Sequence, residues 1–173
     1  HVVIAVLSVS ADAGEVFVSG YTYSSNFPYT GSFGLDLQYL QTQVICYYAL
    51  KLSADGSQLL YSRILGGGIQ MMIETENATK GANIAINSAG EAFVFAHTQS
   101  TSPYMLTGNA FQVIPGGSID AVFTKLGPRG DLIYSTYVGG VNDEEANGIC
   151  YANGKVYCIG TTGSNNFPKQ TNR

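Results

Sequence analysis

The chain has 173 residues, of which 45% are hydrophobic and only 12% are charged. Its net charge is −4, and its eight lysine and arginine residues are scattered, whereas binding to nucleic-acid phosphates needs clustered basic residues. The longest apolar run near the start, Val2 to Leu7, is too short to cross a bilayer. We therefore expect neither a nucleic-acid partner nor insertion into a membrane.

The apolar segments predict strands along the whole chain. They are short, rich in β-branched or aromatic residues, and bounded by Gly, Asn, Asp or Pro, and none has the spacing of an amphipathic helix. Asn153-Gly154 is the strongest hairpin signal, because both residues tolerate a positive φ. Ten strands are expected, at 2–9, 15–22, 44–52, 58–65, 82–87, 91–98, 120–126, 131–138, 147–152 and 155–162.

Two phrases recur along the chain. Residues 14–28 return as 154–168, with a diverged copy at 90–100, and residues 51–67 return as 125–140. A repeat predicts units whose apolar faces are covered only by neighbouring units. The unit comprises four strands: one ending in Lys-Leu, one containing Tyr-Ser, and two that follow a Gly-Gly pair.

The order of the phrases predicts where the units begin and end. We expect a half repeat formed by the last two strands of a unit, then two complete units and a polar tail. Inserted loops are expected at about 29–43, with a partner at 103–119, and at 68–81. The predicted boundaries are 1–28 for the half repeat, 29–103 and 104–168 for the complete units, and 169–173 for the tail.

These phrases resemble the SBBP repeat, a β-propeller-type repeat of large secreted and cell-surface bacterial and archaeal proteins. The last unit carries the pattern best, in residues 120–126, 134–140 and 164–168, whereas the middle unit departs from it at Arg63 and at Ala96-His97. The resemblance implies an all-β chain of tandem four-stranded antiparallel propeller-like blades, about two and a half in number. It implies no reaction, because the family shares no catalytic residues.

No nucleophile, zinc-protease or phosphate-binding motif is present, so we expect a protein that is not an enzyme and has no cofactor. His97 occupies a strand position that Tyr21 and Thr161 hold in the sister copies, which favours a structural role over catalysis.

One acidic cluster follows a Gly-Gly pair. Asp143 and Glu144 offer oxygen ligands on an expected loop, an arrangement that suits Ca²⁺. The alternative is a solvated turn in which Asp143 bonds nearby backbone amides.

Three cysteines are too few for a disulfide scaffold. Cys150 and Cys158 flank the Asn153-Gly154 hairpin. A three-residue loop would place them opposite each other, within reach of a disulfide, whereas a two-residue loop would point them to opposite faces.

Low charge and abundant Ser, Thr, Tyr and Asn favour an extracellular or cell-surface protein. Asn77 begins the sequon Asn77-Ala78-Thr79 in a polar insertion, so it is the predicted glycosylation site if the host glycosylates.

These features predict a non-catalytic structural or adhesive protein that presents surface and assembles through strand edges. Its partners would be copies of itself or further propeller repeats of a longer chain. The expected assembly strand is 2–9, which would pair with another subunit and, if the contact does not close, form a filament. The alternative is part of a ligand-binding, carbohydrate-binding or enzymatic propeller with its site in the inserted loops. The apolar residues of the assembly strand are Val2, Val3, Ile4, Val6 and Leu7.

Overall fold

The computed structural model describes residues 4–12, 14–22, 24–31, 44–70, 82–99 and 104–169. All regular elements in these ranges are β-strands, so the all-β prediction is confirmed, and no helix in them is long and apolar enough to cross a membrane. The strands are β1 (Ile4–Asp12), β2 (Glu15–Thr22), β3 (Val44–Leu52), β4 (Leu59–Gln70), β5 (Asn83–Ile86), β6 (Ala92–Gln99), β7 (Ile119–Leu126), β8 (Leu132–Val138), β9 (Glu144–Ala152) and β10 (Lys155–Thr162).

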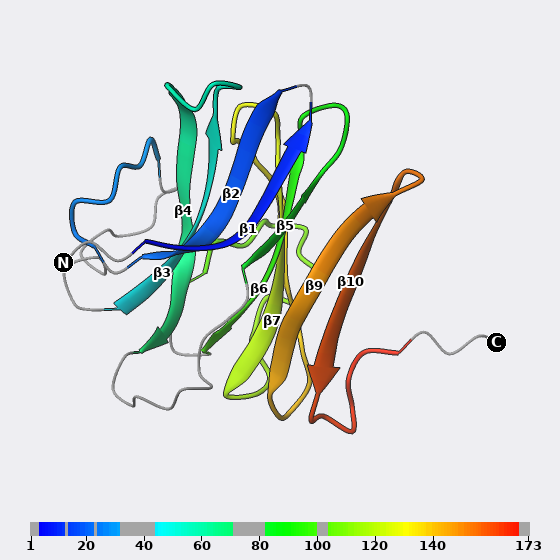
Figure 1. The fold of residues 1–173 in the computed structure, drawn as a ribbon. Coiled ribbons are helices and arrows are strands. Elements are labelled where there is room, and N and C mark those ends of the chain that lie inside the picture. The colour runs from blue at the N-terminus through cyan, green and yellow to red at the C-terminus, as the bar shows by residue number, and fades with distance from the viewer. Residues whose placement is uncertain are drawn as a thin grey trace.

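The strands form three antiparallel sheets (Figure 1). The first sheet has the order β1-β2-β3-β4, the second has the order β5-β6-β7-β8, and the third contains β9 and β10. The first strand of each sheet lies beside the first strand of the next, since β1 contacts β5 and β5 contacts β9. The sheets are therefore arranged side by side in chain order.

The sheet boundaries differ from the predicted repeat boundaries by two strands. Residues 1–28 were expected to supply the last two strands of a unit, but β1 and β2 begin a complete sheet. The reason is that β2 pairs with β3 along its whole length, from Val16 opposite Leu52 to Thr22 opposite Cys46. Each sequence repeat therefore contributes its strands to two different sheets.

Assembly through residues 2–9 was expected because this strand would lack a partner in its own chain. That premise is wrong for the described part of the segment. β1 pairs with β2 of its own chain, from Ile4 opposite Thr22 to Asp12 opposite Glu15. Gly14, with φ 84°, closes the tight turn that returns the chain onto β1. Ile4, Val6 and Leu7 therefore belong to a strand that already has an internal partner. Val2 and Val3 lie outside the described residues.

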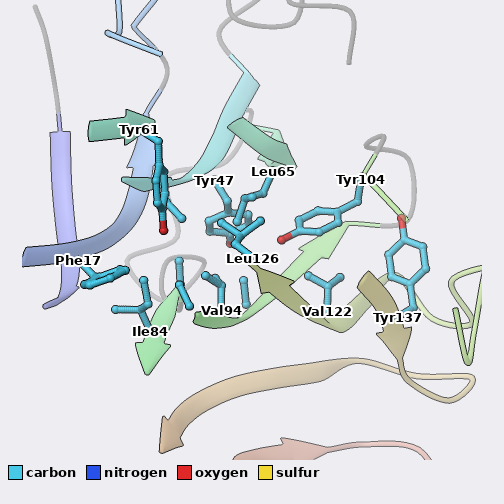
Figure 2. Packing of buried hydrophobic residues seen from close by; sticks show 14 residues of the cluster. Phe17, Tyr47, Tyr61, Leu65, Ile84, Val94, Tyr104, Val122, Leu126 and Tyr137 are labelled. Carbon is cyan, nitrogen blue, oxygen red and sulfur yellow. The ribbon is translucent and has the colours of Figure 1, made fainter. Parts of the chain in front are cut away.

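Apolar side chains fill the space between the first and second sheets. Figure 2 shows side chains of the first sheet pointing toward side chains of the second. Tyr104, from the segment before β7, joins the same buried cluster, and its backbone approaches Gly66 so closely that a side chain there would collide with it. The cluster includes Phe17, Tyr47, Ala49, Tyr61 and Leu65 from the first sheet and Ile84, Val94, Val122, Leu126 and Tyr137 from the second.

Both complete sheets carry the same lysine, glutamate and aromatic group, which we term the staple. In the first sheet, Lys51 lies opposite Phe17, with its Nζ atom 2.5 Å from Glu15 and 5.1 Å from the Phe17 ring centre. In the second sheet, Lys125 lies opposite Phe93, with Nζ 2.8 Å from Glu91 and 5.5 Å from the ring centre. The repeated phrases thus encode the same cross-strand contact twice.

The turn between β7 and β8 docks on the first sheet. Arg63 Nε donates a 2.7 Å hydrogen bond to the Gly130 carbonyl, and Lys51 Nζ donates a 3.4 Å bond to the Pro128 carbonyl. Polar contacts at this end therefore hold the two sheets in a fixed position over their shared apolar layer.

We expect Leu126→Ala to lower the free energy of unfolding by about 2–5 kcal/mol, because Leu126 is fully buried between the two sheets and its removal leaves a cavity. Leu60→Ala is the matched control, since Leu60 is 43% exposed and its truncation should cost about 0.5 kcal/mol or less. Urea unfolding measures both. Equal midpoints for the two variants would contradict the shared core.

Candidate functional site

An apolar groove of about 490 Å³ lies between the second sheet and the hairpin β9–β10. Strands β6, β7 and β8 supply one wall and β10 supplies the other. The apolar part of the wall is formed by Phe95, Ala121, Phe123 and Val138 on the second sheet and by Cys158 and Ile159 on β10.

The two walls of the groove converge where β9 packs on the second sheet. Phe95, Ala121 and Ala146 are buried together there, and Tyr151 stacks on Phe93 with ring centres 5.5 Å apart. β9 therefore covers part of the face of the second sheet, and the groove is the remaining part beside β10.

Two buried carboxylates lie close together, and one of them, Glu144, lines the groove. Asp120 accepts hydrogen bonds from the backbone amides of Gly116 at 3.2 Å and Gly117 at 3.1 Å. Glu144, which is 1% exposed, accepts one bond from the Gly140 amide at 2.8 Å and one from the Thr162 hydroxyl at 2.6 Å. Both carboxylates hold loops of the protein in place.

The carboxylates of Asp120 and Glu144 meet at Gly139. A Cβ atom on Gly139 would lie 1.8 Å from Asp120 Oδ1 and 2.7 Å from Glu144 Oε2, so no larger residue fits between them. Burial raises the pKa of Asp120, the neighbouring negative charge of Glu144 adds to this shift, and the hydrogen bonds from the Gly116 and Gly117 amides oppose it.

The predicted calcium residues have protein partners instead. Glu144 is the first residue of β9 and points inward, whereas it was expected on a loop. Asp143 Oδ1 accepts a 3.1 Å bond from the amide of Ile119, which is 24 residues away in the chain and starts β7. Among the described residues, no group of three or more His, Cys, Asp or Glu side chains is placed to hold a metal. A calcium site at Asp143 and Glu144 thus stays a prediction that no such cluster supports.

The predicted disulfide between Cys150 and Cys158 is excluded by the hairpin. Its loop has only two residues, with Asn153 at φ 52°, so Cys158 pairs with Ile149 while Cys150 pairs with Tyr157. Side chains alternate along a strand, and the two thiols therefore point to opposite faces and remain free. Cys158 lines the groove, where desolvation raises the pKa of its thiol to about 11.

His97 makes a hydrogen bond between two segments of the protein. Its Nδ1 atom accepts a 3.2 Å hydrogen bond from the Ala146 amide, which joins the second sheet to β9. Burial lowers the pKa of His97 and favours the neutral ring that this acceptor role requires.

Ser164 and Asn166 were not among the predicted site residues. The structure shows that their side-chain oxygens accept hydrogen bonds from the Asn142 amide at 2.8 Å and the Val141 amide at 3.0 Å. The recurring Ser-x-Asn-Phe-Pro phrase was the available signal, but only the folded chain brings it beside the Gly-Gly turn.

The remaining predicted site features lie outside the described residues. They are the glycosylation residue Asn77 and most of the inserted loops 29–43 and 68–81.

No family model matches the chain, and no curated protein matches it. Among solved structures, it is similar to Trypanosoma rangeli sialidase in complex with sialic acid, with a TM-score of 0.35 and 11% identity. The match covers 91% of this chain and 19% of the sialidase chain. A likeness this weak supports no conclusion about activity, and the SBBP resemblance stays a prediction.

The raised pKa of Asp120 predicts a pH effect on stability. A carboxyl group with a raised folded-state pKa stabilises the fold at acid pH, and this contribution is lost as the pH rises from about 3.8, its unfolded value, through the folded pKa. Asp120→Asn removes the titration. The free energy of unfolding of the wild type minus that of the variant should therefore fall across this window, as measured by urea unfolding at a series of pH values.

Asp55→Asn provides a control of opposite sign. Hydrogen bonds from Ser53 and Ser57 lower the pKa of Asp55 to about 2, so its contribution is present at neutral pH and lost as the pH falls toward that value. The free energy of unfolding of the wild type minus that of this variant should rise with pH. A rise for both variants would show that Asp120 is not destabilised as an anion.

Proposed function

We propose that this chain is a non-catalytic structural repeat module of an extracellular protein, and that it extends a propeller-like array by receiving a strand pair in the groove. The partner strands would come from a further repeat or from another chain. The observation that carries the proposal is the match between the groove and the filled interface of the first two sheets.

The positions that line the groove are the repeat equivalents of core positions in the first sheet. Tyr47 and Ala49 stand four and two residues before Lys51, as Ala121 and Phe123 do before Lys125. Leu65 and Val138 each precede a Gly-Gly pair. On the first sheet these residues belong to the cluster covered by β7 and β8, through Val122, Leu126 and Tyr137. The groove therefore corresponds to the place of a strand pair of the β7–β8 type.

The free edge of β10 supports the same occupant. β2 and β6 each pair with a third strand of their sheet, whereas β10 pairs only with β9 among the described residues. Its Tyr157 and Ile159 side chains are 51% and 69% exposed. A strand added along this edge would satisfy the backbone groups of β10 and cover apolar surface, at about 25 cal/mol for each Å² buried.

The arrangement of the sheets supports a propeller-like array. Consecutive sheets meet at their first strands, β1, β5 and β9, as blades do around an axis, and apolar layers lie between them. The extracellular location rests on the composition and on the SBBP resemblance.

A second candidate function is the binding of a small apolar ligand in the groove. It is favoured by the groove volume of about 490 Å³, which falls within the range typical of ligand pockets, about 300–1,000 Å³. A thermal-shift screen of sugars and apolar ligands tests this candidate, and competition between a hit and added strands would place both in the groove.

The three cysteines provide a test of strand docking. The probe is a synthetic peptide with the sequence of residues 118–138, which contains β7 and β8. At about ten times its dissociation constant it should slow alkylation of Cys158 about tenfold, because only the unbound fraction reacts. Cys150 lies on the opposite face and should react at an unchanged rate, while the buried Cys46 reports any unfolding. Mass spectrometry measures all three rates.

Matched variants locate the contact. Val138→Asp in the chain places a charge in the groove wall on the second sheet and should abolish the protection of Cys158. Ile114→Asp, at a residue that is 73% exposed and does not line the groove, should leave the protection unchanged. Equal protection of Cys150 and Cys158, or none at either, would count against strand docking.

A further inference from the structure

The third sheet carries a lysine at the position where the staples of the first two sheets carry a glutamate. Glu15 and Glu91 each stand two residues before the aromatic residue that the lysine of the next strand covers. Lys155 occupies this position before Tyr157 on β10. A strand that carried lysine opposite Tyr157, as β3 and β7 do opposite Phe17 and Phe93, would therefore place two ammonium groups side by side.

The geometry of the complete sheets defines which residue of the incoming strand is affected. Lys51 and Lys125 lie directly opposite the aromatic residue, and each side chain reaches diagonally to the carboxylate two residues away, at 2.5 Å and 2.8 Å. Lys155 is exposed at the same place beside the free edge of β10. A carboxylate on the incoming strand would reproduce the ion pair with its charges exchanged.

We propose that the groove and the edge of β10 select a β-hairpin of the repeat type that carries an acidic residue opposite Tyr157, where β3 and β7 carry lysine. This selectivity rests on the proposed strand docking and adds the chemistry of the partner. The third sheet would then bind a partner strand identical to β7 more weakly than one with the opposite charge at a single position, a form of specificity by repulsion.

The test uses the peptide of residues 118–138 and its Lys125→Glu form, each titrated onto the full chain. The Lys125→Glu peptide should bind about tenfold more tightly, since it replaces a like-charge pair by an opposite-charge pair. In a Lys155→Glu chain the order should reverse, with the unmodified peptide binding more tightly. Both differences should shrink at high salt, because the pair lies at an exposed edge.

A peptide with Arg129→Glu is the control for net charge. It has the same total charge as the Lys125→Glu peptide but carries the change in the turn, so its affinity relative to the unmodified peptide should not depend on residue 155. Affinities are measured by fluorescence anisotropy, and protection of Cys158 confirms where each peptide binds.

The outcomes separate the two proposals. If both peptides protect Cys158 but bind equally well, or if their order is the same for wild-type and Lys155→Glu chains, the charge selectivity is wrong and strand docking stands. If neither peptide protects Cys158 in either chain, strand docking fails and the selectivity fails with it.

Discussion

Apolar side chains of two neighbouring sheets share one buried layer, and each sheet depends on the next to complete it. Leu65 of the first sheet and Val94 and Leu126 of the second are fully buried in this layer, which no single sheet could exclude from water. An isolated four-stranded sheet would leave one apolar face wet, at about 25 cal/mol for each Å². The order of the sheets, the close approach at Gly66 and the packing of β9 on the second sheet follow from this need for mutual coverage.

Polar groups fix the position of the layers rather than supplying most of their stability. Partly exposed ion pairs such as Lys125 with Glu91 contribute little free energy, typically about 1 kcal/mol or less. Arg63, His97 and Asn166 instead bond to backbone groups of a neighbouring segment, and each bond is possible in only one alignment. The apolar layer tolerates sliding better than these bonds do, so the polar contacts set the register between sheets.

The strands could be predicted from the sequence because alternation and turn residues are local signals, and all ten were located. The grouping of strands into sheets could not, since a repeat has no marked origin and the pairing of β2 with β3 spans a long connection. The inward turn of Glu144 depends on Gly140 and Thr162, which come from separate segments. The sheet faces to which Cys150 and Cys158 point depend on whether the hairpin loop has two or three residues. The sequence allowed both lengths, and the structure has the two-residue loop, with Asn153 at a positive φ.

The offset between sequence repeat and sheet has a consequence for how such a chain changes length in evolution. One repeat encodes β3 to β6, which are the last two (outer) strands of one sheet and the first two (inner) strands of the next. If recombination duplicates or deletes such a segment, the strands left at the junction are again an inner pair followed by an outer pair. They can join as one sheet, so the array gains or loses a whole sheet without an unpaired strand in its interior. The array therefore tolerates changes in repeat number, because the boundaries of the sequence repeats fall within sheets rather than between them.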